Sequence, residues 1–499
     1  MTGAQVGDYF ESYARYFDLE KHIRFSTVVN KVLRNQADEG WDIHISGSNG
    51  VIEVLDFDKV VFASGSDSIP VWPPMPGREE FEGTVIHGQS YRNPEDFTGR
   101  RVLVVGIGNT ACEVSLGLTR HADKVYQSYR RGRIIISRYD NKGVPTDLMS
   151  WPELQLKYMF DHKVPWIANP LANRLMEKTM IQDAARQDLD DSLTARQKQK
   201  RAEKKIKGDW RLIPYAKMEL THPAVQDDFI RELYAGRITP VHGFKSFIGA
   251  NKVLMGDGST IEVDAVVFCT GYILEFGLMP ELEMDGACGV PLTTAGSANK
   301  RSNAGTSREP PLPRLYQMIF PPKWASSVAV LSWISALETA WCVCELASMA
   351  VAQIWAADTA QRQGCVPPPA GYRKPARLPT EAEMNSSVDE YHTWWRTGRL
   401  KEPSAHAGLI RPYSFYRFLH NMAGTGMFEN AGHKYSLRNL NLWLKDRDLY
   451  NYLTRGPASS HMWRVFDTNP RGIPGHGRRA WPHARQTVED TYQTYQDAK

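Results

Sequence analysis

The feature that most constrains the fold of this sequence is a glycine turn between a short apolar run and a predicted helix. Val102–Val105 has the apolar character that a strand buried on both faces of a parallel sheet needs. Gly106, Gly108 and Ala111 follow in a GxGxxA pattern. The first glycine permits a sharp turn, the second lets the backbone approach a pyrophosphate, and the small alanine lets helix and strand pack closely. This stretch therefore predicts a dinucleotide site at the edge of a parallel sheet.

The residues after the next predicted strand indicate which dinucleotide is bound. Lys124–Ser128 reads as that strand, and Arg130 and Arg131 follow it. A site for NAD places an acidic residue there for the ribose hydroxyls, whereas arginine suits the additional 2′-phosphate of NADP. The pattern favours NADP. A glycine turn between two core strands, with arginines that are only a solvated strand end, remains the alternative at this point.

Composition excludes several function classes. The 499 residues carry 60 basic and 56 acidic side chains, a balance that does not favour nucleic acid or an acidic membrane surface as a partner. The six cysteines include no Cys-x-x-Cys pair, so neither a metal site nor a redox dithiol is indicated, and a reducing compartment is expected. The first twenty residues are acidic and aromatic, so we expect no signal peptide and a cytoplasmic location.

Two segments of unusual composition have simple interpretations. Ala325–Ala357 is the most apolar segment, but Glu338 and Glu345 interrupt it, so a buried strand and helix are expected rather than a membrane span. Thr194–Lys207 is strongly basic but has none of the interleaved aromatic residues that nucleic-acid binding uses. A solvated helix face is therefore expected there.

The N-terminal region alternates predicted elements with turns and ends in a stiff connector. Residues 8–18 have an amphipathic helical pattern, and residues 59–65 read as a buried strand that ends in a small-residue turn. The proline-rich segment Pro70–Gly77 then predicts a stiff link between domains. Further strands are expected at Ile23–Val32, Trp41–Ile45 and Val51–Phe57.

A second motif stands directly before the dinucleotide strand, and together the two motifs resemble a known family. Phe81, Gly83, His87 and Tyr91 form the pattern FxGxxxHxxxY. This pattern beside a GxGN(S/T) turn is similar to the fingerprint of the flavin-containing monooxygenases. The related Baeyer–Villiger monooxygenases end the fingerprint in Trp-Pro, whereas Tyr91 is followed by arginine here, which favours the branch that oxygenates nitrogen and sulfur. The resemblance implies an NADP site built by Phe81, Gly83, His87, Tyr91, Gly106, Gly108, Asn109, Thr110, Ala111, Ser128, Arg130 and Arg131.

Two small-residue turns extend the resemblance over much of the chain. Residues 62–65 and 269–272 look like the two linkers by which the family's chain leaves its FAD domain for the NADP domain and later returns. The resemblance implies an α/β fold with two nested dinucleotide-binding (Rossmann-like) domains, the first of them incomplete, and a mainly helical C-terminal region. It implies a partial FAD-binding domain at 1–75 and 250–355, an NADP-binding domain at 76–249 and the C-terminal region at 356–499. The implied FAD neighbours are Val29, Ser64, Gly65, Thr270 and Gly271.

One expected part of such a protein has no counterpart in the sequence. The family begins with its own strand, GxGxxG turn and helix, which hold the FAD pyrophosphate. Gly3 and Gly7 are not spaced for this turn, and no apolar strand precedes them. We therefore expect the remaining strands of the FAD domain to lose a central neighbour and to expose apolar edges. An incomplete gene prediction, a partner chain that supplies the unit and a descendant that no longer uses FAD are the open explanations.

The function implied by the resemblance is a monooxygenase that uses NADPH, FAD and O2. One oxygen atom passes to a nucleophilic nitrogen or sulfur of a small organic substrate. The flavin carries this chemistry, so no acid–base catalytic residue and no metal are expected. Two alternatives remain at this stage: a Baeyer–Villiger enzyme that acts on a ketone, and a non-catalytic NADP-binding protein that has lost its FAD unit.

Overall fold

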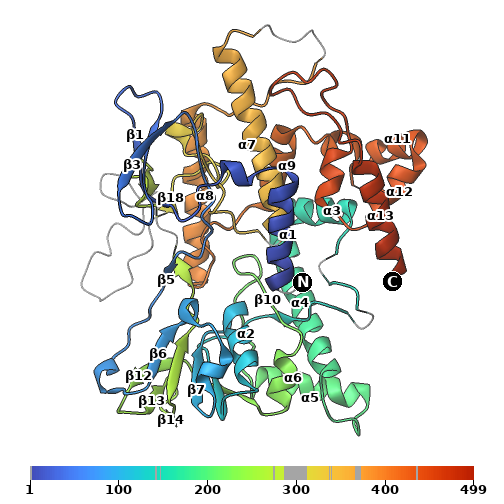
Figure 1. The fold of residues 1–499 in the computed structure, drawn as a ribbon. Helices are drawn as coiled ribbons and strands as arrows, with labels where there is room; N and C mark the ends of the chain where they lie inside the picture. Colours follow the sequence, from blue (N-terminus) through green and yellow to red (C-terminus); the bar gives the residue numbers. More distant parts are fainter. Residues whose placement is uncertain are drawn as a thin grey trace.

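The protein is a mixed α/β molecule with a parallel sheet in its lower body and small sheets and long helices above it (Figure 1). The computed structural model describes residues 3–140, 143–146, 148–273, 276–285, 312–336, 338, 340–365, 372–433 and 436–498. Residues 286–311, within the expected 250–355 segment, lie outside this described part.

A five-stranded parallel sheet, in the order β11-β8-β7-β15-β6, forms the centre of the lower body. The strands are β6 (Thr84–His87), β7 (Arg101–Val105), β8 (Lys124–Ser128), β11 (Ile238–Val241) and β15 (Ala265–Phe268). Strand β7 pairs with β8 on one side and with β15 on the other, in parallel register. Residues 102–105 of β7 are at most 9% exposed, which confirms the prediction of a strand buried on both faces.

Alternate residues of β7 pack into two different hydrophobic cores, one on each face of the sheet. Val102 and Val104 pack in a cluster with α2 (Asn109–Leu118) and α6 (Phe229–Tyr234). Leu103 and Val105 belong to a cluster on the opposite face, which a three-stranded antiparallel sheet covers. The strands of that sheet are β12 (Phe244–Phe247), β13 (Lys252–Met255) and β14 (Thr260–Glu262). Burial on both faces explains why the sequence of β7 is apolar without alternation.

The position of β15 corrects the expected domain boundary. The resemblance implied that residues from 250 onward belong with the FAD-binding segment, yet β15 pairs with β6 and β7 in the lower body. The boundary at residue 249 is therefore wrong, because β15 belongs to the five-stranded parallel sheet of the predicted NADP-binding domain. Within residues 238–247, β11 belongs to the parallel sheet and β12 to the antiparallel one.

Two long helices flank the lower body, α4 (Pro165–Arg186) and α5 (Ala195–Lys207). A capping box begins α5, in which Thr194 and Gln197 bond each other's backbone N–H groups. Only Ala202 and Ile206 of α5 are buried. The expected solvated face of this basic segment is therefore confirmed.

The upper part contains small sheets near the N-terminus. An antiparallel meander is formed by β1 (Val28–Arg34), β2 (Trp41–Ser46) and β3 (Ile52–Phe57). The first of these strands begins five residues later than the sequence predicts, because its pairing with β2 starts at Val28. Strand β4 (Val60–Phe62) pairs in parallel with β19 (Val328–Val330), its only strand partner among the described residues. Strand β17 (Met284–Asp285) pairs with β18 (Leu312–Pro313).

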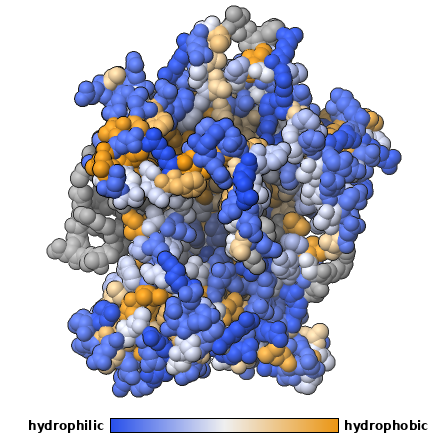
Figure 2. Space-filling model, in the orientation of Figure 1, coloured by the Kyte–Doolittle hydropathy of each residue, from blue (hydrophilic) through white to orange (hydrophobic). Residues whose placement is uncertain are grey.

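Large apolar side chains are exposed throughout the first sixty residues. Helix α1 (Gly3–Tyr16) buries none of its residues, and Phe10 stacks on Trp341 at a centroid distance of 5.1 Å. Val61 of β4 is 44% exposed, in agreement with the expected apolar edge. Figure 2 shows apolar surface over the part of the molecule where Figure 1 draws β1 and β3. The other exposed apolar residues are Tyr9, Tyr13, Tyr16, Phe17, Ile23, Phe25, Val28, Val29, Val51, Ile52, Val54 and Phe57.

Helices make up most of the remaining chain and share the largest core. This core joins α7 (Ala340–Arg362) to α9 (Pro412–Ala423) and to α3 (Trp151–Lys163). In length and composition α7 could cross a membrane, but it packs on α9 and buries seven residues, as expected for a core helix. The other helices are α8 (Glu381–Lys401), α10 (Met427–Asn430), α11 (Leu437–Lys445), α12 (Arg447–Arg455) and α13 (Ala484–Asp497).

Candidate dinucleotide site

The turn between β7 and α2 lies at the carboxyl edge of the parallel sheet, where open α/β sheets bind ligands. Gly106 has φ of 138°, and a Cβ atom there would lie 2.5 Å from the carbonyl oxygen of Cys269. Gly108 caps α2 in an extended conformation, and the only atom within 4 Å of a Cβ at this position is Nη1 of Arg133, at 3.8 Å. Ala111 is fully buried. The turn therefore has the backbone shape and the open space that a pyrophosphate needs beside the N-terminus of α2.

Arg133 is the functional candidate that the sequence analysis missed. Its Nε donates to the carbonyl oxygen of His222 at 2.8 Å, and Nη1 lies over Gly108. Among the described residues it forms no ion pair with a carboxylate, and burial lowers its pKa. A partly buried guanidinium that faces a helix N-terminus suits a phosphate ligand. Its position as the third arginine after β8 was the available signal in the sequence.

Two partly buried histidines adjoin Arg133. The rings of His222 and His406 lie 5.0 Å apart, and Nε2 of His222 is 2.9 Å from the hydroxyl of Ser335. Burial is the main cause that lowers the pKa of each histidine to about 4; the charge of Arg133 contributes at both, and the neighbouring His406 contributes at His222. Asp67 opposes this effect at His406. Both rings are therefore neutral at pH 7, and Arg133 carries the positive charge of this cluster.

These depressed pKa values predict acid sensitivity. In the unfolded chain the histidines have pKa values near 6.5, so between about pH 6.5 and 4 the unfolded chain binds more protons than the folded one. The free energy of unfolding should fall across this interval, by at most roughly 3 kcal/mol per histidine. Thermal unfolding at pH 7.5 and pH 5 measures the loss. The double variant His222→Gln/His406→Gln should lose less than the unmodified chain, and an equal loss in both would contradict the assignment.

The three residues expected to bind a 2′-phosphate have different surroundings. Ser128 is fully buried, and its hydroxyl donates to the carbonyl oxygen of His242 at 3.0 Å. Arg131 pairs with Glu402 at 3.0 Å, and Glu402 is only 2% exposed. Arg130 is exposed and makes no hydrogen bond or ion pair within the described residues. Of the three, Arg130 is the one whose side chain has no hydrogen-bond or ion-pair partner within the described residues.

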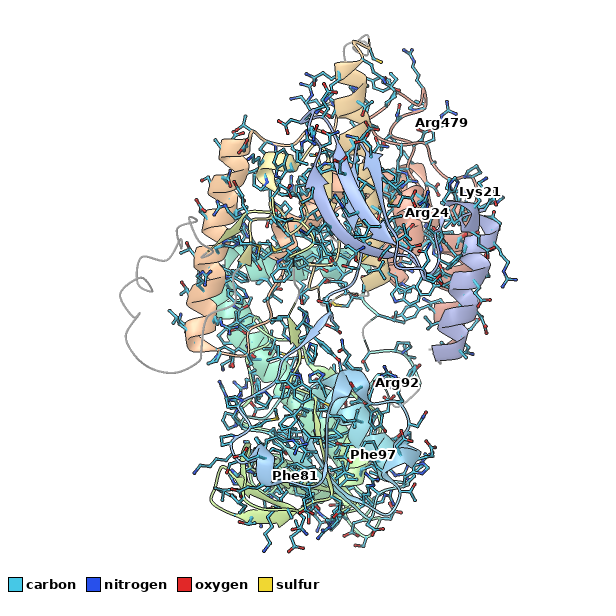
Figure 3. The ribbon with its side chains drawn as sticks, turned by 60° about the vertical axis from the view of Figure 1, so that its left-hand side comes forward. Lys21, Arg24, Phe81, Arg92, Phe97 and Arg479 are labelled. Carbon is cyan, nitrogen blue, oxygen red and sulfur yellow. The ribbon has the colours of Figure 1, made fainter. Side chains whose placement is uncertain are left out.

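The structure separates the four residues of the FxGxxxHxxxY motif. Phe81 and Gly83 lie before β6, at the amino edge of the sheet, where Phe81 packs on Phe247 at 4.6 Å. Figure 3 shows Phe81 low in the body, away from Arg92, which follows the last motif residue. His87 ends β6 at the carboxyl edge, and Tyr91 packs under α2 near Gly117. Only the second half of the motif therefore lies at the edge that carries the glycine turn.

His87 and Tyr91 support the site rather than face it. The ring of His87 packs edge-on against Trp72 at 5.5 Å and Tyr272 at 5.1 Å, and its Nδ1 accepts from the N–H of Gln89. Burial lowers the pKa of His87. Burial, together with nearby acidic groups, raises the pKa of Tyr91 to about 12. Both side chains are therefore uncharged at neutral pH.

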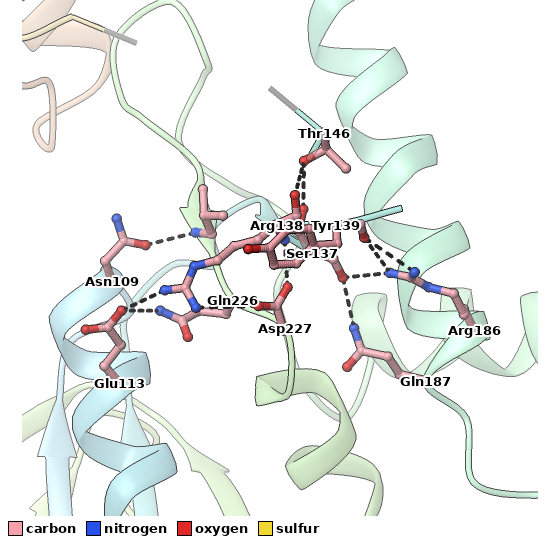
Figure 4. Close-up of polar contacts among 11 residues, drawn as sticks. Asn109, Glu113, Ser137, Arg138, Tyr139, Thr146, Arg186, Gln187, Gln226 and Asp227 are labelled. Carbon is pink, nitrogen blue, oxygen red and sulfur yellow. Dashed lines mark hydrogen bonds and ion pairs between the residues drawn. The ribbon is translucent and has the colours of Figure 1, made fainter. Parts of the chain in front are cut away.

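The amide of Asn109 serves the architecture of the site. Its Oδ1 accepts from the N–H of Val225, in the short strand β10 (Ala224–Val225), which pairs with β9 (Ile135–Ile136). Figure 4 shows the polar network around it, in which Arg138 bridges Glu113 of α2 to Asp227. Thr110 packs against Gly88, with its Cγ2 3.3 Å from the position of a Cβ there. The network holds the segment after β8 against α2.

The candidate FAD neighbours fall into two groups. Thr270 and Gly271 lie beside Val71: the hydroxyl of Thr270 donates to the Val71 carbonyl, and the Val71 N–H donates to Gly271 at 3.0 Å. Here β5 (Ile69–Pro70) pairs with β16 (Tyr272–Ile273), so the predicted linker at 269–272 runs beside the segment that follows the first linker. The second group, Ser64 and Gly65 after β4 and Val29 in β1, is exposed.

The described residues fit one dinucleotide pyrophosphate. Gly106, Gly108 and Arg133 provide the sharp turn, the close approach and the positive charge that a pyrophosphate uses. In the described part of the chain no other glycine turn joins a parallel strand to the start of an α-helix. Among the described residues, this turn is thus the one place whose backbone fits a dinucleotide pyrophosphate.

Comparison with known proteins identifies the family. The sequence model described as Flavin-binding monooxygenase-like matches residues 1–209. Monooxygenase aurF of Gibberella zeae is 32% identical over 487 residues, a match that covers 97% of this chain and 81% of that protein. The chain belongs to the flavin-binding monooxygenase-like family. The resemblance stated from the fingerprint motifs is thus confirmed.

Two further proteins match this chain, one in sequence and one in structure. It is 30% identical to Flavin-containing monooxygenase 5 of Homo sapiens over 56% of the chain, and it spans about half the length of that relative, 49%. Cyclohexanone monooxygenase from Rhodococcus sp. Phi1, in a crystal structure bound to NADP+, superposes with a TM-score of 0.53 over 87% of this chain and 84% of that one. At 16% identity this similarity concerns the fold alone.

Proposed function

We propose that the chain is an NADPH- and FAD-dependent monooxygenase that transfers one oxygen atom from O2 to a nitrogen or sulfur atom of a small organic substrate. Family membership supports a flavin-dependent oxygenation. The observation that carries NADPH as the reductant is the turn at Gly106–Ala111, with Arg133 above it and Arg130 free at the end of β8. FAD, when bound, supplies the reaction with O2.

The residues of this chain are assigned to binding and positioning NADPH. Gly108 and the N-terminus of α2 receive the pyrophosphate, and Arg133 neutralises it. Arg130 binds the 2′-phosphate. Asn109, His87 and Tyr91 hold the surrounding backbone through the contacts described above. Arg131 pairs with Glu402 and is therefore assigned to structure.

Spectroscopy of the purified chain tests this function. A flavin absorption spectrum that NADPH bleaches and O2 restores, with oxidation of a tertiary amine or a thioether, would support the proposal. A colourless protein that binds NADPH would instead support a non-catalytic NADP-binding protein. Conversion of a ketone to an ester, without amine or thioether oxidation, would support a Baeyer–Villiger enzyme. Tyr91 and Arg92, which stand in the place of Trp-Pro, favour the first outcome.

Arg133→Met should weaken NADPH binding by roughly ten- to a hundredfold, because the charge-assisted bonds of one guanidinium to phosphate are lost. Isothermal titration with NADPH measures the change in Kd. Arg120→Met is a matched control, since Arg120 is exposed at the end of α2 and makes no polar contact among the described residues. Equal affinities in the two variants would contradict the assignment of Arg133.

Arg130→Ala should reduce the preference for NADPH over NADH by about tenfold or more, because only NADPH carries the 2′-phosphate. The ratio of the two Kd values measures this preference. Arg131→Ala provides the contrast: it removes the partner of the buried Glu402, so it should lower the melting temperature and leave the ratio unchanged. The opposite pattern would exchange the roles of the two arginines.

A further inference from the structure

A pocket in the helical part of the molecule is used by none of the residues discussed so far. It lies between α3, α9, α10 and α11, and its volume is about 390 Å³. Figure 1 shows α3 beside α9 and α11 on the side of the molecule that carries the C-terminus, apart from the parallel sheet. A small organic ligand fits a pocket of this size. Its aromatic lining residues are Trp151, Tyr158, Tyr413, Tyr416 and Phe428.

The polar atoms of these aromatic lining residues bond within the protein. The surface that they present to the pocket is therefore mainly that of their rings. Tyr158 and Tyr416 stack at 5.1 Å and both donate their hydroxyls to Glu338. Trp151 donates its Nε1–H to the carbonyl oxygen of Ala431 at 2.9 Å. Phe428 lies edge-on to Trp151 at 5.3 Å. Rings held in this way form a rigid apolar slot, and flat aromatic molecules stack well in such slots.

The charged side chains in the described lining of the pocket are two arginines. They are Arg417 and Arg438, and the described lining contains no aspartate or glutamate. Arg417 lies over the ring of Phe428 at 5.8 Å, and Arg438 donates to the carbonyl oxygen of Phe428. Neither arginine forms an ion pair with a described carboxylate. Two such guanidinium groups beside an aromatic slot attract an anionic group on the ligand.

We propose that this pocket binds a planar aromatic molecule that carries an acidic group, such as an aryl carboxylate. The aromatic ring lies between Tyr158, Tyr416 and Phe428, and the anionic group faces Arg417 and Arg438. Because the two arginines attract an anionic group, we expect the pocket to bind such a molecule more tightly than a neutral aromatic molecule of equal size. The binding needs neither NADPH nor flavin, so it goes beyond the proposed oxygenation and can be tested without turnover.

The test compares two probes of nearly equal shape, 1-naphthoate and the neutral 1-naphthamide, by isothermal titration of the full chain. The naphthoate should bind at least about tenfold more tightly than the amide. The double variant Arg417→Gln/Arg438→Gln should lose this difference, with a fall of about tenfold or more in naphthoate affinity. Lys445→Gln, which removes one charge from α11 outside the pocket, should bind both probes as the unmodified chain does.

A second variant tests the location. Met159→Trp adds volume to the lining and should abolish binding of both probes, whereas the double arginine variant should retain the amide. Unchanged NADPH affinity shows that each variant is folded. Equal affinity for naphthoate and naphthamide, or naphthoate binding that survives the double arginine variant, would overturn the proposal. A chain without monooxygenase activity that still binds naphthoate in this way would leave it standing.

Discussion

Gly106→Ala should abolish measurable NADPH binding and reduce the free energy of unfolding by roughly 2–4 kcal/mol. Two effects add at this position. The φ of 138° is outside the range that alanine adopts without strain, and the new Cβ would lie 2.5 Å from the carbonyl oxygen of Cys269. The turn must therefore open, and β7 separates from β15, the strand that precedes Cys269. Titration with NADPH and chemical denaturation measure the two losses.

Gly108→Ala is the matched control for this variant. Gly108 has φ of −82° and ψ of 179°, which alanine accepts, and a Cβ there meets only the end of a flexible arginine side chain at 3.8 Å. This variant should keep its stability within about 0.5 kcal/mol and lose affinity for NADPH, because the methyl group occupies the space of the pyrophosphate. If both variants lost stability equally, the turn would not have the conformation described here.

The second large effect is expected from Gly132→Ala, which should destabilise the fold by about 3 kcal/mol or more. Backbone atoms of Leu212 lie against Gly132, well inside the contact distance of an added Cβ. Gly132 also donates its N–H to Pro214 at 3.0 Å and bridges to Tyr215. No rotamer change relieves a contact between two backbones, so one of the two segments must move. Thermal and denaturant unfolding measure the loss.

Gly7→Ala provides the comparison for Gly132→Ala. Gly7 lies in α1 with open space at its Cβ position, so alanine should be neutral or slightly stabilising there. A similar loss of stability in both variants would show that the close approach of Leu212 is not the cause.

The sequence predicted the features that depend on neighbouring residues. An apolar run, two spaced glycines and a small residue are sufficient to specify β7, the turn and α2, because each local preference agrees with the burial of the strand on both faces. The basic helix α5 and the core position of α7 were also predictable, since composition and periodicity determine which face of a helix is solvated. The nested arrangement of two dinucleotide domains remains a prediction from the resemblance.

The features that the sequence did not reveal depend on distant partners. Arg131 was predicted as a phosphate ligand together with Arg130, and this stays a prediction; its pairing with Glu402, 271 residues further along, lies beyond any local pattern. Phe81 and His87 belong to one motif and lie at opposite edges of the sheet, because β6 runs between them. The strand β15 was assigned to the wrong segment, since sequence reveals a buried strand but not which sheet receives it. The sequence did not single out Arg133, because its place beside Gly108 is a property of the folded chain.

The contacts around the dinucleotide turn affect which fragments and chimeras of this protein can fold. Arg131 pairs with Glu402, His222 bonds to Ser335, and the N–H of His406 donates to Leu220 at 2.9 Å. Each of these pairs joins the nucleotide-binding half to the C-terminal third of the chain. A fragment cut after β15 would leave the carbonyl of Leu220 and the buried edge of Arg133 open to water. These contacts join the nucleotide-binding part to the C-terminal third, so a chimera that exchanges the C-terminal helices should retain Ser335, Glu402 and His406 to remain stable.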